Sequence, residues 1–183
     1  MDNKSELLLR LNPVNKTVPV LLHGDRAIVE YIDKVFDGPP LLPTDPYDRA
    51  TNARVWVHFM ATKCAKPFWM ALWLDGEAQK RFVKETRKNL TRLEEQLRGN
   101  RFLAGDSIGY ADLAGSYMAL MLDMFEELTG VSLMADDEYP VVRQWVMEYN
   151  SDEAVKGCVT NKEQLAAYLK VNKDKYKMKK QHL

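Results

Sequence analysis

Apolar residues recur every three or four positions along most of this chain, which is the spacing of amphipathic helices. The pattern predicts a short helix over 5–11, a second over 27–36 and a long third from 45 to about 74. Beyond these it predicts helices from 76 to 98, from 109 to 128 and from 140 to 149, a short one after Ser151, and a last one capped by Asn161. The chain is therefore expected to be mostly helical.

Only residues 18–22 have the pattern of a β-strand, and Pro19 is an unusual residue near the start of a strand. A proline lacks the N–H of a ladder donor, so it belongs at a strand's first residue, on an edge or at a bulge. One interpretation is a trans proline that opens a buried strand. The other is a cis Val18–Pro19 bond that turns the backbone of Val18 outward to pair with an extended ligand. One strand forms no sheet, so the first 40 residues look like part of a domain.

Several residues mark where the helices should start, bend or stop. Asp45 and Pro46 form a strong helix start, and Pro67 should kink the long helix that follows. Asp112, three residues after Gly109, resembles the acidic member of a capping box. The helix from 109 to 128 carries little charge before Asp123, which predicts that it lies at the buried centre of a bundle.

Composition adds few chemical clues. The 26 basic and 26 acidic residues balance, so the total charge gives no support for a nucleic-acid or membrane partner. No apolar run reaches the ~18 residues of a membrane span, and no signal peptide is recognisable, so a cytoplasmic location is expected. Cys64 and Cys158 form no metal or disulfide pattern and are expected to be buried, inert thiols. The histidines have no partners at metal-ligand spacing, so no metal site is predicted.

A set of ordered segments resembles the plant tau class of glutathione transferases. The segments are 4–9, Asn12-Pro13-Val14, Val18-Pro19-Val20-Leu21, Glu30-Tyr31-Ile32-Asp33, Pro40-Leu41-Leu42-Pro43, 45–50, Arg54-Val55-Trp56 and 105–112. The resemblance implies an α+β, mostly α fold: an incomplete thioredoxin-like domain over 1–37, a linker over 38–44 and an all-α domain over 45–183. It also implies glutathione as co-substrate and no cofactor. Dimers, with a second copy or with intact relatives, are implied as well.

The resemblance implies only a remnant of the glutathione site. In the family the backbone of Val18 binds the cysteinyl part of glutathione, and Lys4 reaches its glycyl carboxylate. The family's catalytic serine precedes the segment that matches Met1. The family's Glu-Ser pair, which holds the γ-glutamyl group, has no counterpart in this chain, where Val29 follows Ile28 directly. Thr17 stands where lysine is usual. We therefore expect an amino-terminally truncated, internally deleted member with weak or absent conjugating activity and no catalytic residue.

The resemblance also implies a pocket for hydrophobic substrates. By position on the family template, Ala65, Trp69, Leu72 and Met121 would face it. The simpler alternative is that these apolar side chains are ordinary core, because stripes of this kind usually are. Two further functions stay open: a non-catalytic carrier of hydrophobic ligands, and a dimerisation partner of intact relatives.

Overall fold

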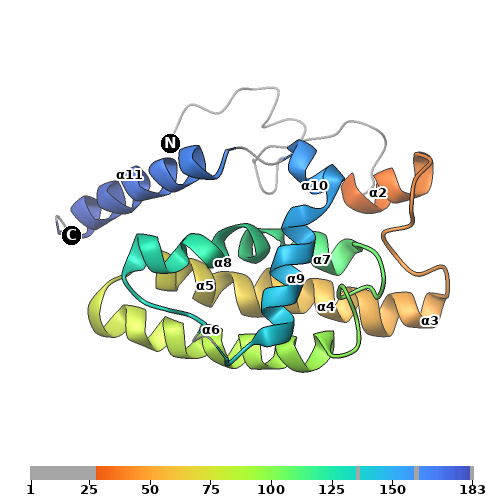
Figure 1. Cartoon of the computed structure of the whole chain (residues 1–183), viewed down its shortest axis with the longest axis horizontal. Coiled ribbons are helices and arrows are strands. Elements are labelled where there is room, and N and C mark those ends of the chain that lie inside the picture. The colour runs from red at the N-terminus through yellow and green to blue at the C-terminus, as the bar shows by residue number, and fades with distance from the viewer. Residues whose placement is uncertain (1–27, 135–136, 159–160, 182–183) are drawn as a thin grey trace. The chain divides into compact units, whose positions relative to one another are not determined.

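The described chain is built of helices in the predicted order (Figure 1). The structure is a computed structural model that describes residues 28–134, 137–158 and 161–181. Its elements are α2 (Ile28–Val35), α3 (Pro46–Asp48), the π-helical η1 (Arg49–Ala53), α4 (Arg54–His58), the π-helical η2 (Phe59–Cys64), α5 (Ala65–Trp73), α6 (Gly76–Leu97), α7 (Tyr110–Ala114), α8 (Ser116–Thr129), α9 (Pro140–Ser151), α10 (Glu153–Cys158) and α11 (Lys162–Gln181). The predicted helix over 5–11 and strand over 18–22 lie outside the described residues.

The chain divides into two compact units, Met1–Leu42 and Pro43–Leu183. The boundary falls inside the proline-rich segment 38–44. In the first unit α2 is followed by a turn in which the backbone N–H of Leu41 donates to Asp33 Oδ1 at 2.5 Å. The Tyr31 and Phe36 rings meet edge to face at 6.4 Å. The assignment of this unit to a thioredoxin-like fold stays a prediction.

The long helix predicted from 45 is continuous to Trp73, but π-helical turns interrupt it twice. It starts as expected, with Asp45 Oδ1 accepting the backbone N–H of Asp48 at 2.9 Å and Pro46 in the first turn. The irregular turns η1 and η2 both precede Pro67, which itself lies in the first turn of α5. Sequence reasoning placed the irregularity at the proline, whereas the structure has these π turns upstream of it.

A side chain from α6 compensates for the donor that Pro67 lacks. In an α-helix the residue at 67 would donate its N–H to the carbonyl of Lys63, four residues earlier. Here Asn89 Nδ2 donates to that carbonyl at 2.9 Å, and the Asn89 side chain is buried. The amide therefore satisfies a buried acceptor and ties α6 to the end of η2.

The helix predicted over 109–128 is divided, so that prediction was wrong in detail. α7 ends at Ala114 and α8 begins at Ser116, with Gly115 between them. A Cβ on Gly115 would collide with Met60 Cε and lie 3.3 Å from Trp145 Cη2. A larger residue at 115 would force the Met60 side chain to move and would crowd Trp145, a constraint that the helical spacing does not reveal.

Asp112 lies at the centre of the second unit and is 0% exposed. Its carboxylate accepts the backbone N–H groups of Leu103 at 2.8 Å, Ala104 at 3.3 Å and Gly109 at 3.0 Å. Trp145 Nε1 donates to the same carboxylate at 2.8 Å. The predicted capping role is present, and the carboxylate also joins the 102–109 segment to α9, which crosses α8 and α6 steeply in Figure 1.

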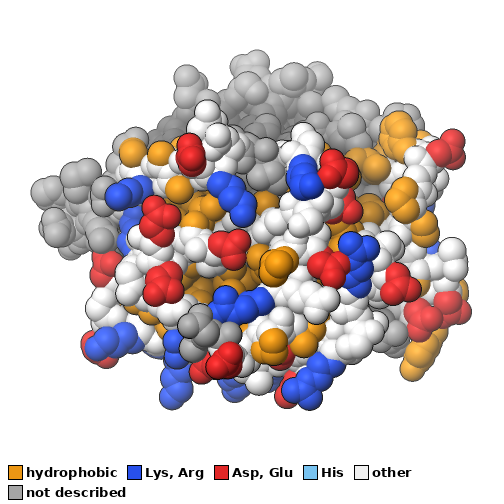
Figure 2. All heavy atoms as spheres, in the orientation of Figure 1, with side chains coloured by type: hydrophobic (Ala, Val, Ile, Leu, Met, Phe, Trp, Pro, Cys, Tyr) orange, Lys and Arg blue, Asp and Glu red, His pale blue; other side chains and the backbone are white. Residues whose placement is uncertain are grey.

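The surface carries charges of both signs. Figure 2 shows acidic and basic side chains interspersed over the visible face of the described residues. Within those residues, no helix has the length and apolar character needed to cross a membrane. Cys64 is buried as expected, but Cys158 is exposed, like the rest of the short helix α10, which has no buried residue. The prediction of a buried thiol at 158 was therefore wrong.

Candidate functional site

Five aromatic rings from α5 and α8 gather in the second unit, and we call them the aromatic cluster. They are Phe68, Trp69, Trp73, Tyr117 and Phe125. Phe68 is fully buried and meets both α8 rings, with ring centroids 5.4 Å from Tyr117 and 5.4 Å from Phe125. The two phenylalanines form a fixed base, because rings in such contacts hold each other's orientation.

Three half-buried rings complete the cluster, of which Trp69 and Tyr117 contact Phe68. Trp69 stacks on Trp73 with centroids 6.1 Å apart and planes 10° apart, as the i, i+4 spacing on α5 allows. Trp69 also stacks on Tyr117 of α8, at 6.0 Å and 27°. The result is a row of nearly parallel aromatic faces that remains partly open to solvent. Such a row offers apolar and stacking contacts and no acid–base group.

Tyr117 is held in place through its hydroxyl. The group donates to the carbonyl of Met60 at 3.0 Å, within the π-helical segment η2. Burial raises the pKa of Tyr117 well above its usual range, and the neighbouring Cys64 raises it further. The phenol is therefore neutral at physiological pH and already donates to a backbone carbonyl, so it acts as a positioning group for the ring.

The nearest thiol is equally unreactive. Burial raises the pKa of Cys64 to about 12, an effect that the positive charge of Arg92 only partly offsets. A neutral thiol is a poor nucleophile. Among the described residues no group of three histidine, cysteine or acidic side chains could hold a metal ion. The cluster thus presents aromatic surface beside an un-ionised phenol and thiol.

The structure separates the predicted pocket residues by depth. Ala65 and Trp69 on α5 are half-buried. Leu72 is 1% exposed and Met121 4% exposed, and both lie in the main hydrophobic core. Their role as pocket residues stays a prediction. Lys4 and Val18, the predicted glutathione contacts, lie outside the described residues.

Sequence reasoning missed Trp73 and Tyr117. Both were within reach of helical spacing, since Trp73 lies four residues after Trp69 and Tyr117 four residues before Met121. What the spacing could not supply was the pairing of α5 with α8, which brings Trp69 against Tyr117.

Comparisons with known proteins agree with this architecture. The family model described as the glutathione S-transferase C-terminal domain matches residues 59–153. Glutathione transferase GST 23 from Zea mays is 38% identical over 181 residues, covering 95% of this chain and 81% of that protein. The structure of a tau-class glutathione S-transferase from mango is similar, with a TM-score of 0.79 at 34% identity, covering 93% of this chain and 83% of the mango chain. A rice glutathione transferase solved with glutathione also has a TM-score of 0.79, at 29% identity, with 95% and 82% covered.

The chain therefore belongs to the glutathione S-transferase family. Within the family, these relatives place it in the tau class of plants, as the resemblance of its sequence predicted. Residues 59–153 of the helical second unit match the family's C-terminal domain. The truncation and the internal deletion stay predictions.

Proposed function

We propose that the 183-residue polypeptide is a cytoplasmic binder of hydrophobic compounds that conjugates them to glutathione weakly or not at all. The proposal has two parts, one resting on the aromatic cluster and the other on the sequence around Ile28. Apolar compounds are its proposed ligands, glutathione is at most a weakly held co-substrate, and no cofactor is proposed.

The single observation that supports the binding part is the row formed by Trp69, Trp73 and Tyr117. Half-buried aromatic rings with their faces held parallel gain contact area with a flat apolar ligand at little cost in conformational entropy. The buried Phe68 and the Tyr117 hydroxyl bond to Met60 keep the row in one arrangement before a ligand arrives. Such preorganisation strengthens binding.

The weak conjugation follows from the residues that would hold glutathione. The family resemblance implies a Glu-Ser pair after a segment like Ala27-Ile28, but here Ile28 and Val29 already belong to α2. Glu30 is in the first turn of this helix and is half-buried. Within the described residues the aromatic cluster contributes no ionised group to lower the pKa of a bound thiol. Conjugation needs both a held tripeptide and a thiolate.

We expect turnover of glutathione with an aryl chloride to be at least about a hundredfold below that of a tau-class enzyme such as the rice relative, because an unactivated and poorly held thiol loses about that much. The measurement is the absorbance of the conjugate under matched conditions. Calorimetric titration with glutathione serves as the companion experiment and should give little heat.

Turnover close to that of the rice enzyme would contradict the weak-conjugation part. It would leave the aromatic cluster to be tested separately by ligand binding. Because the aromatic cluster favours binding and the Glu-Ser contacts to glutathione are missing, we favour a non-catalytic carrier over a conjugating enzyme.

A further inference from the structure

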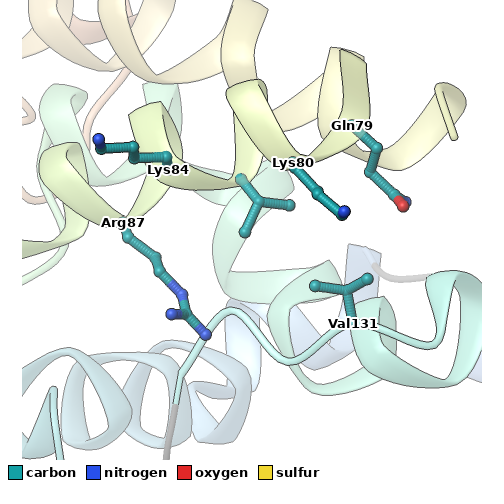
Figure 3. A pocket seen from close by; sticks show the side chains of 6 residues that line it. Gln79, Lys80, Lys84, Arg87 and Val131 are labelled. Atoms are coloured by element: carbon teal, nitrogen blue, oxygen red, sulfur yellow. The ribbon is translucent and has the colours of Figure 1, made fainter. Parts of the chain in front are cut away.

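A small cavity with a basic lining lies between α6 and the segment that follows α8. Its volume is about 240 Å³, and it shares no residue with the aromatic cluster. Its lining residues are Gln79, Lys80, Val83, Lys84, Arg87 and Val131. In Figure 3, Lys80 and Arg87 extend from α6 toward the segment that carries Val131, while the Lys84 ammonium points the other way.

The lining is positively charged. Lys80, Lys84 and Arg87 follow one another at four- and three-residue spacing, so they share one face of α6. No acidic residue lines the cavity. Lys80 Nζ bonds Glu77 at 2.6 Å, but both side chains are largely exposed, and an exposed pair of this kind is weak. Lys80 can therefore exchange this partner for an anion in the cavity.

Arg87 is the fixed cation of the site. One guanidinium nitrogen, Nη2, donates to the carbonyl of Ser132 at 2.8 Å, which anchors the side chain against the segment opposite. Its Nε is buried and has no hydrogen-bond partner among the described residues. Because this nitrogen has almost no accessible surface, the contribution of Arg87 to the cavity is its positive charge. A carboxylate or sulfonate complements this charge and that of Lys80.

The rest of the lining is apolar. Val83 is 8% exposed and belongs to the core, and the half-buried Val131 packs against that core. We propose that this cavity binds small amphiphilic organic anions of the aromatic carboxylate or sulfonate class. The anionic group lies at Arg87 and Lys80, and the ring lies against Val83 and Val131.

The test is calorimetric titration of the whole chain with 2-naphthalenesulfonate. We expect saturable binding of the sulfonate. Inorganic sulfate, which lacks the ring, and the neutral 2-naphthalenemethanol, which lacks the charge, should each bind about tenfold more weakly. Lys80→Glu should weaken binding of the sulfonate by about tenfold, since it reverses the charge of a side chain that lines the cavity. Lys88→Glu, at an exposed lysine on α6 outside the cavity, is the matched control and should change it by less than about twofold.

Arg87→Gln should weaken binding at least as much as Lys80→Glu, provided that circular dichroism shows an intact fold. If Arg87→Gln loses the fold, the Lys80→Glu and Lys88→Glu variants test the proposal instead, because both side chains are exposed and their substitution leaves the core intact. A Trp69→Ala variant with unchanged affinity for the sulfonate excludes the aromatic cluster as its site. Equal affinity in Lys80→Glu, Lys88→Glu and the unmodified chain would overturn the proposal, as would equal affinity for the neutral alcohol.

Discussion

Asp112→Ala is expected to lower the free energy of unfolding by about 3–5 kcal/mol, because it leaves several buried donors without their shared acceptor. The substitution removes the acceptor of three backbone N–H groups and of the Trp145 indole. All of these donors meet a carboxylate that is 0% exposed, so water is not at hand to replace it. Each buried donor left without a partner costs about 1–3 kcal/mol. Chemical denaturation followed by circular dichroism measures the effect.

Asp106→Ala is the matched control, because Asp106 is an exposed aspartate in the same connecting segment. We expect it to change the stability by less than about 0.5 kcal/mol. Asp112→Asn keeps one oxygen acceptor and turns the other position into a donor, so its loss of stability should lie between those of Asp112→Ala and Asp106→Ala. A loss below about 1 kcal/mol for Asp112→Ala would contradict the role given to this carboxylate.

Glu94→Ala is expected to cost about 2–4 kcal/mol, because it removes the cap of a helix to which Glu94 does not belong. Glu94 lies on α6 and is 8% exposed. Its carboxylate accepts the first-turn N–H groups of α9, from Val141 at 3.1 Å and from Val142 at 2.8 Å. The cap thus also holds α6 and α9 together, and its loss should appear in the same denaturation experiment.

The neighbouring residue provides the comparison. Glu95 is exposed on α6, so Glu95→Ala removes the same charge from the same helix with no buried donor, and an effect below about 0.5 kcal/mol is expected. Glu94→Gln retains one acceptor and should lose less than Glu94→Ala. Equal stability of the Glu94→Ala and Glu95→Ala variants would show that the α9 cap contributes nothing.

Much of the helical fold was predictable because its determinants are local. The start at Asp45 and Pro46 and the cap at Asn161, whose side chain accepts the N–H of Glu163 at 2.8 Å, both follow from residue type and spacing. The acidic residue of the Gly109–Asp112 start was recognisable for the same reason. These features depend on side chains acting within about one helical turn.

The remaining features depend on contacts between distant segments. Asn89, which compensates for Pro67, lies 22 positions after it in the sequence. Glu94, which caps α9, lies 47 positions before Val141. Met60 and Trp145 lie close to Gly115 at the break between α7 and α8, and neither is near it in the sequence. The stacking of Trp69 on Tyr117 has the same origin. Periodicity identifies a helix and its apolar face but does not specify which helix lies against that face.

The most direct test of the central claim is fluorescence titration with a neutral hydrophobic dye such as Nile red, because a neutral dye is not attracted by the basic cavity. We expect saturable binding at micromolar dye with quenching of tryptophan emission. Trp69→Ala should weaken this binding about tenfold, since it removes the ring that stacks with both Trp73 and Tyr117. Trp56→Ala, at another half-buried tryptophan of the same long helix, should change it by less than about twofold. Absence of saturable binding, or equal affinity in the Trp69→Ala and Trp56→Ala variants, would contradict the claim that the aromatic cluster is a ligand site.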